Sequence, residues 1–144
     1  MCLDRKPTRD EVIRDFKKKI QVEKGSYFGY KIFQKDKKKL YSSIYFGGPY
    51  ELNEWIIDKS KATVDYSETD SEYRCGFHVY IDKEEALEVF KHYKKLETGH
   101  YSSLYSLRKV YFNKVIAYGY EENAPSPLYI RTIITREIFI PKMR

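Results

Sequence analysis

Two segments of the chain carry apolar residues at the spacing of an amphipathic helix. In the first segment the apolar stripe consists of Val12, Ile13, Phe16 and Ile20. Thr8 and Glu11 have the spacing of a capping box at its start, and Gly25 provides a stop signal at its end. We therefore predict a helix over residues 8–24 that covers one face of a sheet.

The second helical pattern begins after Asp82, which has Glu85 three residues later as another capping box. Its apolar stripe consists of Ala86, Val89, Phe90, Tyr93 and Leu96. Because Gly99 follows the last of these residues, we predict a helix over residues 83–97.

Alternating apolar and polar positions elsewhere in the chain predict β-strands. The predicted strands cover residues 27–34, 40–46, 50–57, 76–81, 108–118 and 128–140. In the first of them, the alternation places Lys31 on the face opposite Tyr30 and Ile32. In the third, Trp55 is expected to be packed.

Two polar segments interrupt the predicted strands. Residues 35–39, Lys-Asp-Lys-Lys-Lys, predict an exposed hairpin loop between two strands. Residues 58–73 are polar and acidic and predict a mobile loop, the kind of segment that often carries function.

These elements together define the expected fold class. The chain has 144 residues and a mass of 17.3 kDa, which fits one compact domain. The order helix, four strands, helix, two strands, with hairpin-length connections, predicts a largely antiparallel, twisted sheet packed by two helices. We expect a single α+β domain over residues 1–144, in which the sheet region covers 27–144.

The charge balance bears on the kind of partner. The chain has 27 basic and 21 acidic residues, a net charge of +6, and a pI near 9.1. This surplus favours acidic partners such as nucleic acid, phosphorylated ligands or an acidic protein surface. A soluble protein with lysine-rich loops that bind no partner would have the same net charge.

Composition also excludes several classes of protein. Hydrophobic residues make up 42% and charged residues 33%, which is unlike a disordered tail. The sequence has no apolar run of the roughly 20 residues that a membrane span needs, and no signal peptide at its start. We therefore expect a cytoplasmic protein with no membrane partner.

Tyrosine is unusually abundant, with 15 Tyr against 8 Phe and 1 Trp. Because its ring is apolar and its hydroxyl stays hydrated, tyrosine suits half-buried strands and interfaces. The excess predicts a sheet with a contact surface. The codon bias of an AT-rich genome would enrich the same residue without any function.

Cationic and aromatic side chains are the candidates for binding. The candidate binding residues are Tyr30, Lys37, Lys38, Lys39, Trp55, Lys109, Lys114 and Arg131. The rings can act as stacking platforms beside the lysine loop, and the strand cations can grip phosphate or carboxylate. A solvated sheet face with ordinary cross-strand aromatic packing would carry the same residues.

Two residues are candidates for catalysis. His78 lies at the start of a strand that leads into a helix, where it can act as an acid, a base or an anion ligand, or simply be a hydrogen-bonded structural residue. Cys2 becomes N-terminal if Met1 is removed, and its own amine can then activate the thiol. The alternative role for Cys2 is a small apolar residue packed against the sheet.

No cofactor or metal ion is expected from the sequence. The only cysteines are Cys2 and Cys75, too few for a disulfide framework or a zinc site. His92 and His100 are not spaced as metal ligands, and neither a nucleotide-binding fingerprint nor a nucleophile elbow is present.

Short motifs along the chain carry a resemblance. They are Met1–Leu3, Gly29–Phe33, Trp55, Gly76–Tyr80 and Lys114–Gly119. In this combination the chain resembles a group of small uncharacterised proteins of bacteriophages and prophages, over most of its length from residue 29 onward. The resemblance implies a phage or prophage origin and an anti-defence role, such as anti-CRISPR activity, directed at a host protein or nucleoprotein complex.

A looser likeness is to ADP-ribosyltransferase-type folds, in which a strand with a small-residue turn precedes a helix as in Gly76–Leu96. It implies an enzyme whose catalytic glutamate comes late in the chain. The late glutamates to test are Glu121, Glu122 and Glu137.

The sequence thus leads to one expected function and two alternatives. We expect a non-enzymatic binding protein that engages an acidic partner through its lysines and tyrosines. The alternatives are an enzyme that acts through His78 or Cys2 and an assembly protein that forms a symmetric oligomer.

Overall fold

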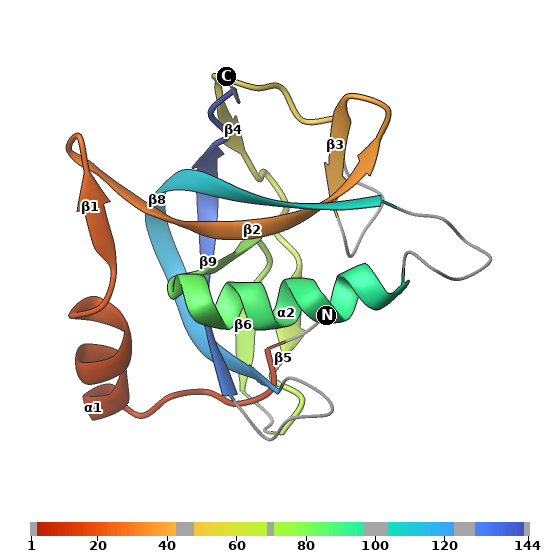
Figure 1. Ribbon diagram of the computed structural model, residues 1–144. Coiled ribbons are helices and arrows are strands. Elements are labelled where there is room, and N and C mark those ends of the chain that lie inside the picture. Colours follow the sequence, from red (N-terminus) through yellow and green to blue (C-terminus); the bar gives the residue numbers. More distant parts are fainter. Residues whose placement is uncertain (1–2, 43–47, 69–70, 97–103, 123–128, 143–144) are drawn as a thin grey trace.

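The computed structural model describes residues 3–42, 48–68, 71–96, 104–122 and 129–142 (Figure 1). In chain order the elements are α1 (Arg9–Glu11), the π-helical turn η1 (Val12–Lys17), β1 (Gln21–Glu23), β2 (Ser26–Asp36), β3 (Lys39–Ser42), β4 (Trp55–Ile57), β5 (Thr63–Asp65), β6 (Glu72–Arg74), β7 (Phe77–Tyr80), α2 (Lys83–Leu96), β8 (Leu104–Glu122) and β9 (Tyr129–Phe139). The fold mixes helices with a mostly antiparallel sheet, which confirms this much of the expected fold class.

Four strands of the main sheet pair in a closed circuit. β8 pairs with β2 through its first half and with β9 through its second half. β7 pairs with β9 and also meets β2, at Tyr30 opposite Tyr80. The circuit β2–β8–β9–β7 therefore returns to its starting strand, a closure that the sequence pattern did not predict.

Two local features allow the strands to bend around this circuit. In β8 the register with β9 shifts between Val115 and Ala117, and Lys114 has a φ of 58°. Such a bulge bends a strand and increases its twist. Where β2 meets β7, a Cβ on Gly29 would lie 2.6 Å from the Tyr80 carbonyl oxygen. Only glycine permits that approach.

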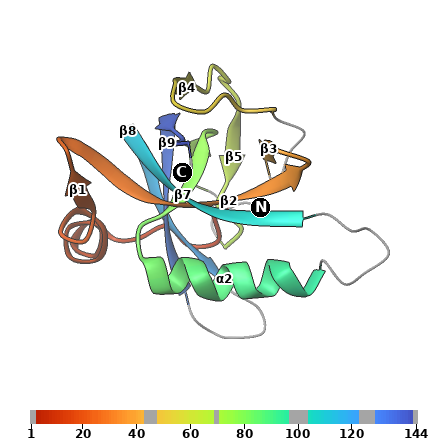
Figure 2. The same cartoon turned by 45° about the horizontal axis from the view of Figure 1, so that its top comes forward.

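α2 packs against one side of these strands (Figures 1 and 2). It begins at Lys83 as predicted, and the Asp82 side chain accepts a hydrogen bond of 2.9 Å from the Glu85 amide. Ala86, Val89 and Tyr93 are buried against Ile32 and other residues of the strands. The stripe read from the sequence is therefore confirmed at these three positions.

The N-terminal helix differs from the prediction for residues 8–24. The Thr8–Glu11 capping box forms, but the helix ends at Lys17 and residues 21–23 form β1. Lys24 and Gly25 both have positive φ, 53° and 79°, as a two-residue hairpin turn between β1 and β2 requires. Gly25 thus serves a hairpin rather than a helix end.

The short helix also covers less of the sheet than expected. In Figure 1, α1 lies to one side of the strands rather than across them. Phe16 is fully buried and contacts the rings of Tyr118 and Tyr120, whereas Ile13 is 41% exposed. Phe16, rather than a full apolar stripe, is the buried residue of this helix, and the Tyr120 hydroxyl adds hydrogen bonds to Glu11 and Asp15.

The middle of β2 is buried on both faces, and Lys31 lies on the face opposite Ile32, as the alternation predicted. Lys31 is only 6% exposed, and Ile32 and Phe33 beside it are buried as well. α2 covers the side of Ile32, while Phe33 belongs to the larger core inside the circuit. A strand with both faces covered cannot be recognised from alternation alone.

The exposed hairpin predicted at residues 35–39 forms between β2 and β3, but its turn is limited to residues 37–38, because Lys35 and Asp36 pair with Leu40 and Lys39. The strand predicted over 40–46 is β3 at Lys39–Ser42, and residues 43–47 lie outside the described part of the chain.

Two other predicted segments need correction. Of the strand predicted over 50–57, only β4 forms, and its Trp55 is 43% exposed rather than packed. The segment 58–73, predicted as a loop, contains the two-stranded sheet β5–β6. Tyr66 and Tyr73 are buried there beneath Leu3, which anchors the segment.

Among the described residues, no helix has the length and apolar character needed to cross a lipid bilayer.

Candidate functional site

His78, the first catalytic candidate, lies in a buried polar cluster. Its Nδ1 atom is 3.1 Å from Oε1 of Glu121, and the Tyr80 hydroxyl donates to Oε2 of the same carboxylate at 3.1 Å. The Lys31 ammonium donates to the His78 carbonyl oxygen at 3.0 Å. These four residues are 8% exposed or less. The cluster therefore joins β2, β7 and β8 in the interior.

Burial dominates the electrostatics of this cluster. It lowers the pKa of His78, although hydrogen bonding to Glu121 works in the opposite direction. It lowers the pKa of Lys31 to about 8, with the Glu121 charge opposing the shift. The pKa of Tyr80 is raised well above its usual value by burial and by the same carboxylate. None of the three cavities described below is lined by His78, so a catalytic role for it stays a prediction.

The other catalytic candidates are placed as follows. Cys2 and the side chain of Glu122 lie outside the described part of the chain. Glu121 belongs to the buried cluster, and Glu137 accepts a hydrogen bond of 3.1 Å from Lys114. The described residues contain no group of three or more His, Cys, Asp or Glu side chains that could hold a metal ion.

The strand cations predicted to bind a partner are neutralised within the chain. Lys109 forms an ion pair with Glu23, and Lys114 pairs with Glu137 at 3.1 Å. Arg131 contacts Glu85 and lies 3.0 Å from Asp82, the cap of α2. These cations therefore serve internal contacts on separate parts of the sheet.

The rings of Tyr30 and Trp55 have different surroundings. Tyr30 lies opposite Lys109 across the β2–β8 pair, and its half-buried ring packs against the residues beneath α2. Trp55 lies on β4, beside Phe139 of β9, and its ring is much more accessible. Only Trp55 of these two presents a large surface to solvent.

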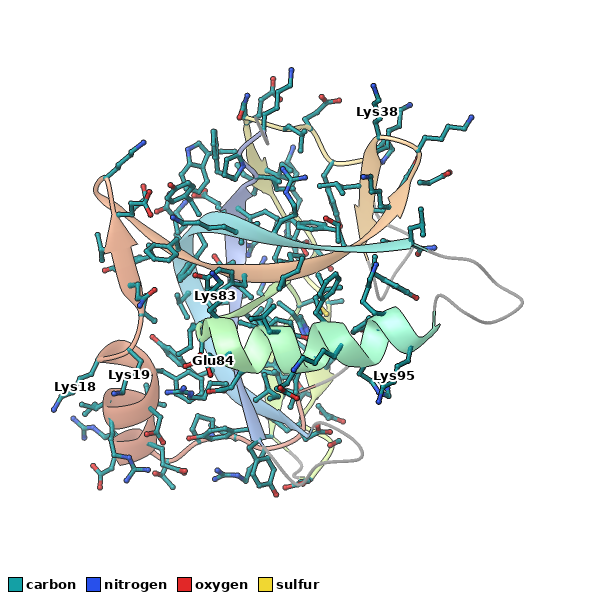
Figure 3. The ribbon with its side chains drawn as sticks, viewed as in Figure 1. Lys18, Lys19, Lys38, Lys83, Glu84 and Lys95 are labelled. Carbon is teal, nitrogen blue, oxygen red and sulfur yellow. The ribbon has the colours of Figure 1, made fainter. Side chains whose placement is uncertain are left out.

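The hairpin lysines are in a different situation from the strand cations. Lys37, Lys38 and Lys39 are exposed, and none of them forms an ion pair or a side-chain hydrogen bond in the described structure. Lys38 and Lys39 border a cavity of about 440 Å³, together with Lys142 from the C-terminal end of the described chain. We call this cavity the lysine cleft. Figure 3 shows Lys38 far from Lys18 and Lys19.

The remaining lining of the lysine cleft combines apolar and polar side chains. These residues are Leu40, Pro49, Tyr50, Glu51, Leu52 and Asn53. Tyr50 packs edge-on against Phe33 and Phe77, which fixes the floor of the cleft to the main core. The lining of the cleft thus includes three lysines and one carboxylate, that of Glu51, together with apolar side chains.

A second cavity, of about 370 Å³, is lined by three aromatic rings. The ring centroids of Trp55 and Phe139 are 5.6 Å apart, and those of Tyr111 and Phe139 are 6.3 Å apart. The remaining lining residues are Glu23, Lys24, Ser26 and Pro141. We call this cavity the aromatic pocket.

The lysine cleft and the aromatic pocket lie next to each other. Asn53 lines the cleft, and Trp55, two residues later, lines the pocket. On the neighbouring segment, Lys142 lines the cleft and Pro141 lines the pocket. Hydrogen bonds of 2.9 Å from the Asn53 amide to the Ile140 carbonyl oxygen and of 2.8 Å from the Lys142 amide to Oδ1 of Asn53 join the two segments.

Sequence reasoning found part of this surface and missed part. It named Lys37, Lys38, Lys39 and Trp55, but not Lys142, Tyr111 or Phe139. Tyr111 and Phe139 are register partners on β8 and β9, so a correct pairing of the two terminal strands would have brought them together.

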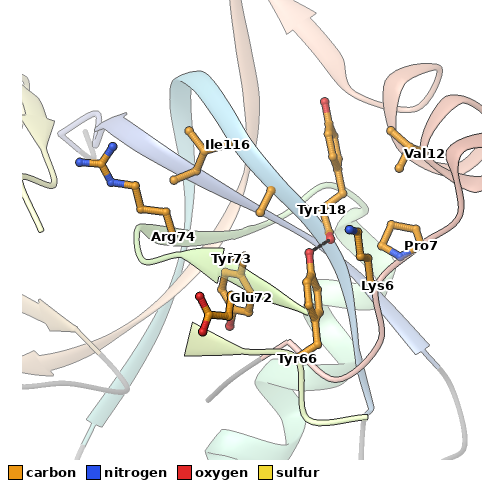
Figure 4. A pocket seen from close by; sticks show the side chains of 10 residues that line it. Lys6, Pro7, Val12, Tyr66, Glu72, Tyr73, Arg74, Ile116 and Tyr118 are labelled. Carbon is orange, nitrogen blue, oxygen red and sulfur yellow. Dashed lines mark hydrogen bonds between the residues drawn. The ribbon is translucent and has the colours of Figure 1, made fainter. Parts of the chain in front are cut away.

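The third cavity, of about 360 Å³, lies between the N-terminal segment and β6 and β8 (Figure 4). Its charged lining residues are Lys6, Glu72 and Arg74. The Tyr66 hydroxyl donates to the Tyr118 carbonyl oxygen at 2.8 Å across its floor. Because its charges are mixed, this cavity selects less clearly for an acidic ligand than the lysine cleft does.

Comparison with family models, with curated proteins and with solved structures found no match for this chain.

Proposed function

We propose that the protein is a non-enzymatic binding protein that engages an acidic partner at the lysine cleft. One observation carries the proposal: the lysines of the β2–β3 hairpin lack acidic partners within the described structure, whereas the strand cations are paired. A host nucleoprotein complex, the partner implied by the resemblance to phage proteins, would present such an acidic surface.

The local charge supports this proposal. Lys37, Lys38 and Lys39 are consecutive, so their ammonium groups repel one another at the tip of a tight hairpin. Lys142 adds a further positive charge to the lining of the cleft. An anion bound between them would relieve this repulsion, and exposed charges of one sign also accelerate the approach of an oppositely charged partner.

A matched pair of triple variants tests the proposal. The first variant is Lys37→Asn, Lys38→Gln and Lys39→Gln, in which asparagine suits the positive φ of 57° at residue 37. The control is Lys17→Gln, Lys18→Gln and Lys19→Gln, at the end of the N-terminal helix. Both variants remove three positive charges, and therefore any difference between them reports position rather than net charge.

The probe is inorganic polyphosphate, titrated at several salt concentrations. We expect the hairpin variant to bind about tenfold more weakly or worse, and its slope of log K against log salt to be shallower by about 2, since each lost phosphate contact removes about 0.7 from that slope. The control should keep the slope of the wild-type protein. Equal losses in the two variants, or no binding by the wild-type protein, would overturn the proposal.

A further inference from the structure

We infer that the acidic partner is a single-stranded nucleic acid, with phosphates in the lysine cleft and an unpaired base in the aromatic pocket against Trp55. This inference rests on the proposed function and names the partner class of the same surface. It is carried by the shared border of the two cavities, where Asn53 and Lys142 of the cleft are close in sequence to Trp55 and Pro141 of the pocket.

The ring of Trp55 is both exposed to solvent and supported by a neighbouring ring, as a stacking surface for a base requires. It is 43% exposed, although tryptophan is among the most apolar large side chains, and it is held on one side by Phe139 at 5.6 Å. Tyr111 extends the aromatic lining beyond Phe139 and is fixed by a hydrogen bond of 3.1 Å from its hydroxyl to Glu23. Rings that are supported in this way can stack a base without first having to be ordered.

The charge of the aromatic pocket also fits a phosphate-bearing ligand. Its one carboxylate, that of Glu23, is already paired with Lys109 and hydrogen-bonded to Tyr111. Lys24, on the same lining, forms no ion pair with any described residue. The uncompensated charge of the pocket is therefore positive, as in the neighbouring cleft.

A single strand fits this combination better than the other acidic partners do. In a duplex the faces of the bases are stacked on one another and cannot reach Trp55. An acidic peptide can satisfy the lysines with its carboxylates but gives the three rings no flat partner. Single-stranded binding sites combine a positive groove that follows the backbone with aromatic rings that stack the bases.

The intrinsic fluorescence of Trp55 provides a direct readout, because it is the only tryptophan in the chain. We would titrate the full chain with a short single-stranded oligonucleotide and with an abasic oligonucleotide of the same number of phosphates. A duplex of the same length and a polyglutamate peptide complete the set of probes.

We expect the single strand to quench Trp55 fluorescence and to bind about tenfold more tightly than the abasic strand at equal salt. In affinities measured from the fluorescence anisotropy of end-labelled strands, a readout that does not need the tryptophan, Trp55→Leu should remove that difference. The matched control is Tyr129→Leu, which replaces a ring of almost equal exposure, 42%, on β9 outside both cavities, and it should keep the difference.

The failures of the two proposals can be told apart. If the abasic strand, the duplex or the peptide binds as tightly as the single strand, and Trp55 is not quenched, the inference is wrong while binding of an acidic partner stands. If no probe shows a binding loss specific to the Lys37–Lys39 variant, both proposals are wrong.

Discussion

At the scale of single residues, Lys31 combines a positive charge with almost complete burial. Its ammonium group lies 5.8 Å from the ring centroid of Phe33 and 5.9 Å from that of Phe77, inside the closed circuit of strands. It donates one hydrogen bond, to the His78 carbonyl oxygen, and the nearest opposing charges are those of Glu121 and Asp58. Desolvation is the larger effect, which is why its pKa falls to about 8.

This pKa predicts a dependence of stability on pH. Between about pH 8 and about pH 10.4, the unfolded chain carries a proton on residue 31 that the folded protein has released. The free energy of unfolding should therefore rise with pH in this window. The variant Lys31→Met has no titratable group at this position. The difference in free energy of unfolding between the wild-type protein and this variant should therefore rise across this pH window, by at most about 3 kcal/mol.

Urea unfolding of both proteins at several values between about pH 7.5 and about pH 10 measures this difference. His78 does not interfere, because its lowered pKa makes the protein lose stability only as the pH falls below about 6.5. The raised pKa of Tyr80 lowers stability only above about pH 10, in both proteins. A relative stability that stays constant across the window would mean that Lys31 keeps an ordinary pKa.

At the scale of elements, α2 is fastened to β9 by charge as well as by its apolar stripe. Arg131 of β9 reaches both Glu85 in the first turn of α2 and Asp82 at its cap. The Arg131 side chain is 19% exposed, so this contact is better shielded than the Lys114–Glu137 pair, whose lysine side chain is 68% exposed. The two cations look alike in the sequence but have different environments.

We therefore predict different consequences for Arg131→Gln and Lys114→Gln. The first leaves two carboxylates at the start of α2 without their cation and should lower the free energy of unfolding by about 1–3 kcal/mol. The second removes an exposed pair and should cost less than about 1 kcal/mol. Neither residue lines the lysine cleft, so both variants should bind polyphosphate with the salt slope of the wild-type protein.

Chemical denaturation and the polyphosphate titration check these two variants together. If Arg131→Gln binds polyphosphate more weakly but keeps the free energy of unfolding of the wild-type protein, Arg131 contacts the ligand. That result would contradict its role as the partner of Glu85 and Asp82.

The elements with a strong periodic signal were predictable from the sequence. The 3.6-residue period after Asp82 and the lysine hairpin before β3 each reflect local chemistry. The helix begins where expected, and the turn of the hairpin is shorter than the predicted loop. The helix over 8–24 failed because Lys24 and Gly25 close a hairpin with β2, a pairing that is stabilised by contacts outside the helical window. The segment 58–73 failed because Tyr66 and Tyr73 are buried by Leu3, which is distant in sequence.

The candidate site was predictable only in part for a similar reason. Exposed lysines in a hairpin are evident from the sequence, but whether a strand cation is free depends on its neighbours across the sheet. Lys109 is paired because β1 folds back and brings Glu23 beside it. Lys142 joins the cleft because the Asn53 side chain holds the backbone of the last segment. Neither contact can be predicted from the residues that are close to it in the sequence.

At the scale of the whole molecule, the fold separates cations that support the structure from cations that remain available. Lys109, Lys114 and Arg131 meet carboxylates on β1, on β9 and at the start of α2, and the chain as a whole has a net charge of +6. The lysine cleft, with its unpaired lysines, borders the aromatic pocket, in which the ring of Trp55 is 43% exposed. This division, rather than the total charge, is the basis of the proposed function.

Mapping backbone amide chemical shifts during a polyphosphate titration tests this division most directly. The account predicts that the largest shifts fall at Lys37–Lys39, Asn53 and Lys142, around the lysine cleft. Largest shifts at Lys17–Lys19, or at the paired strand cations, would contradict it.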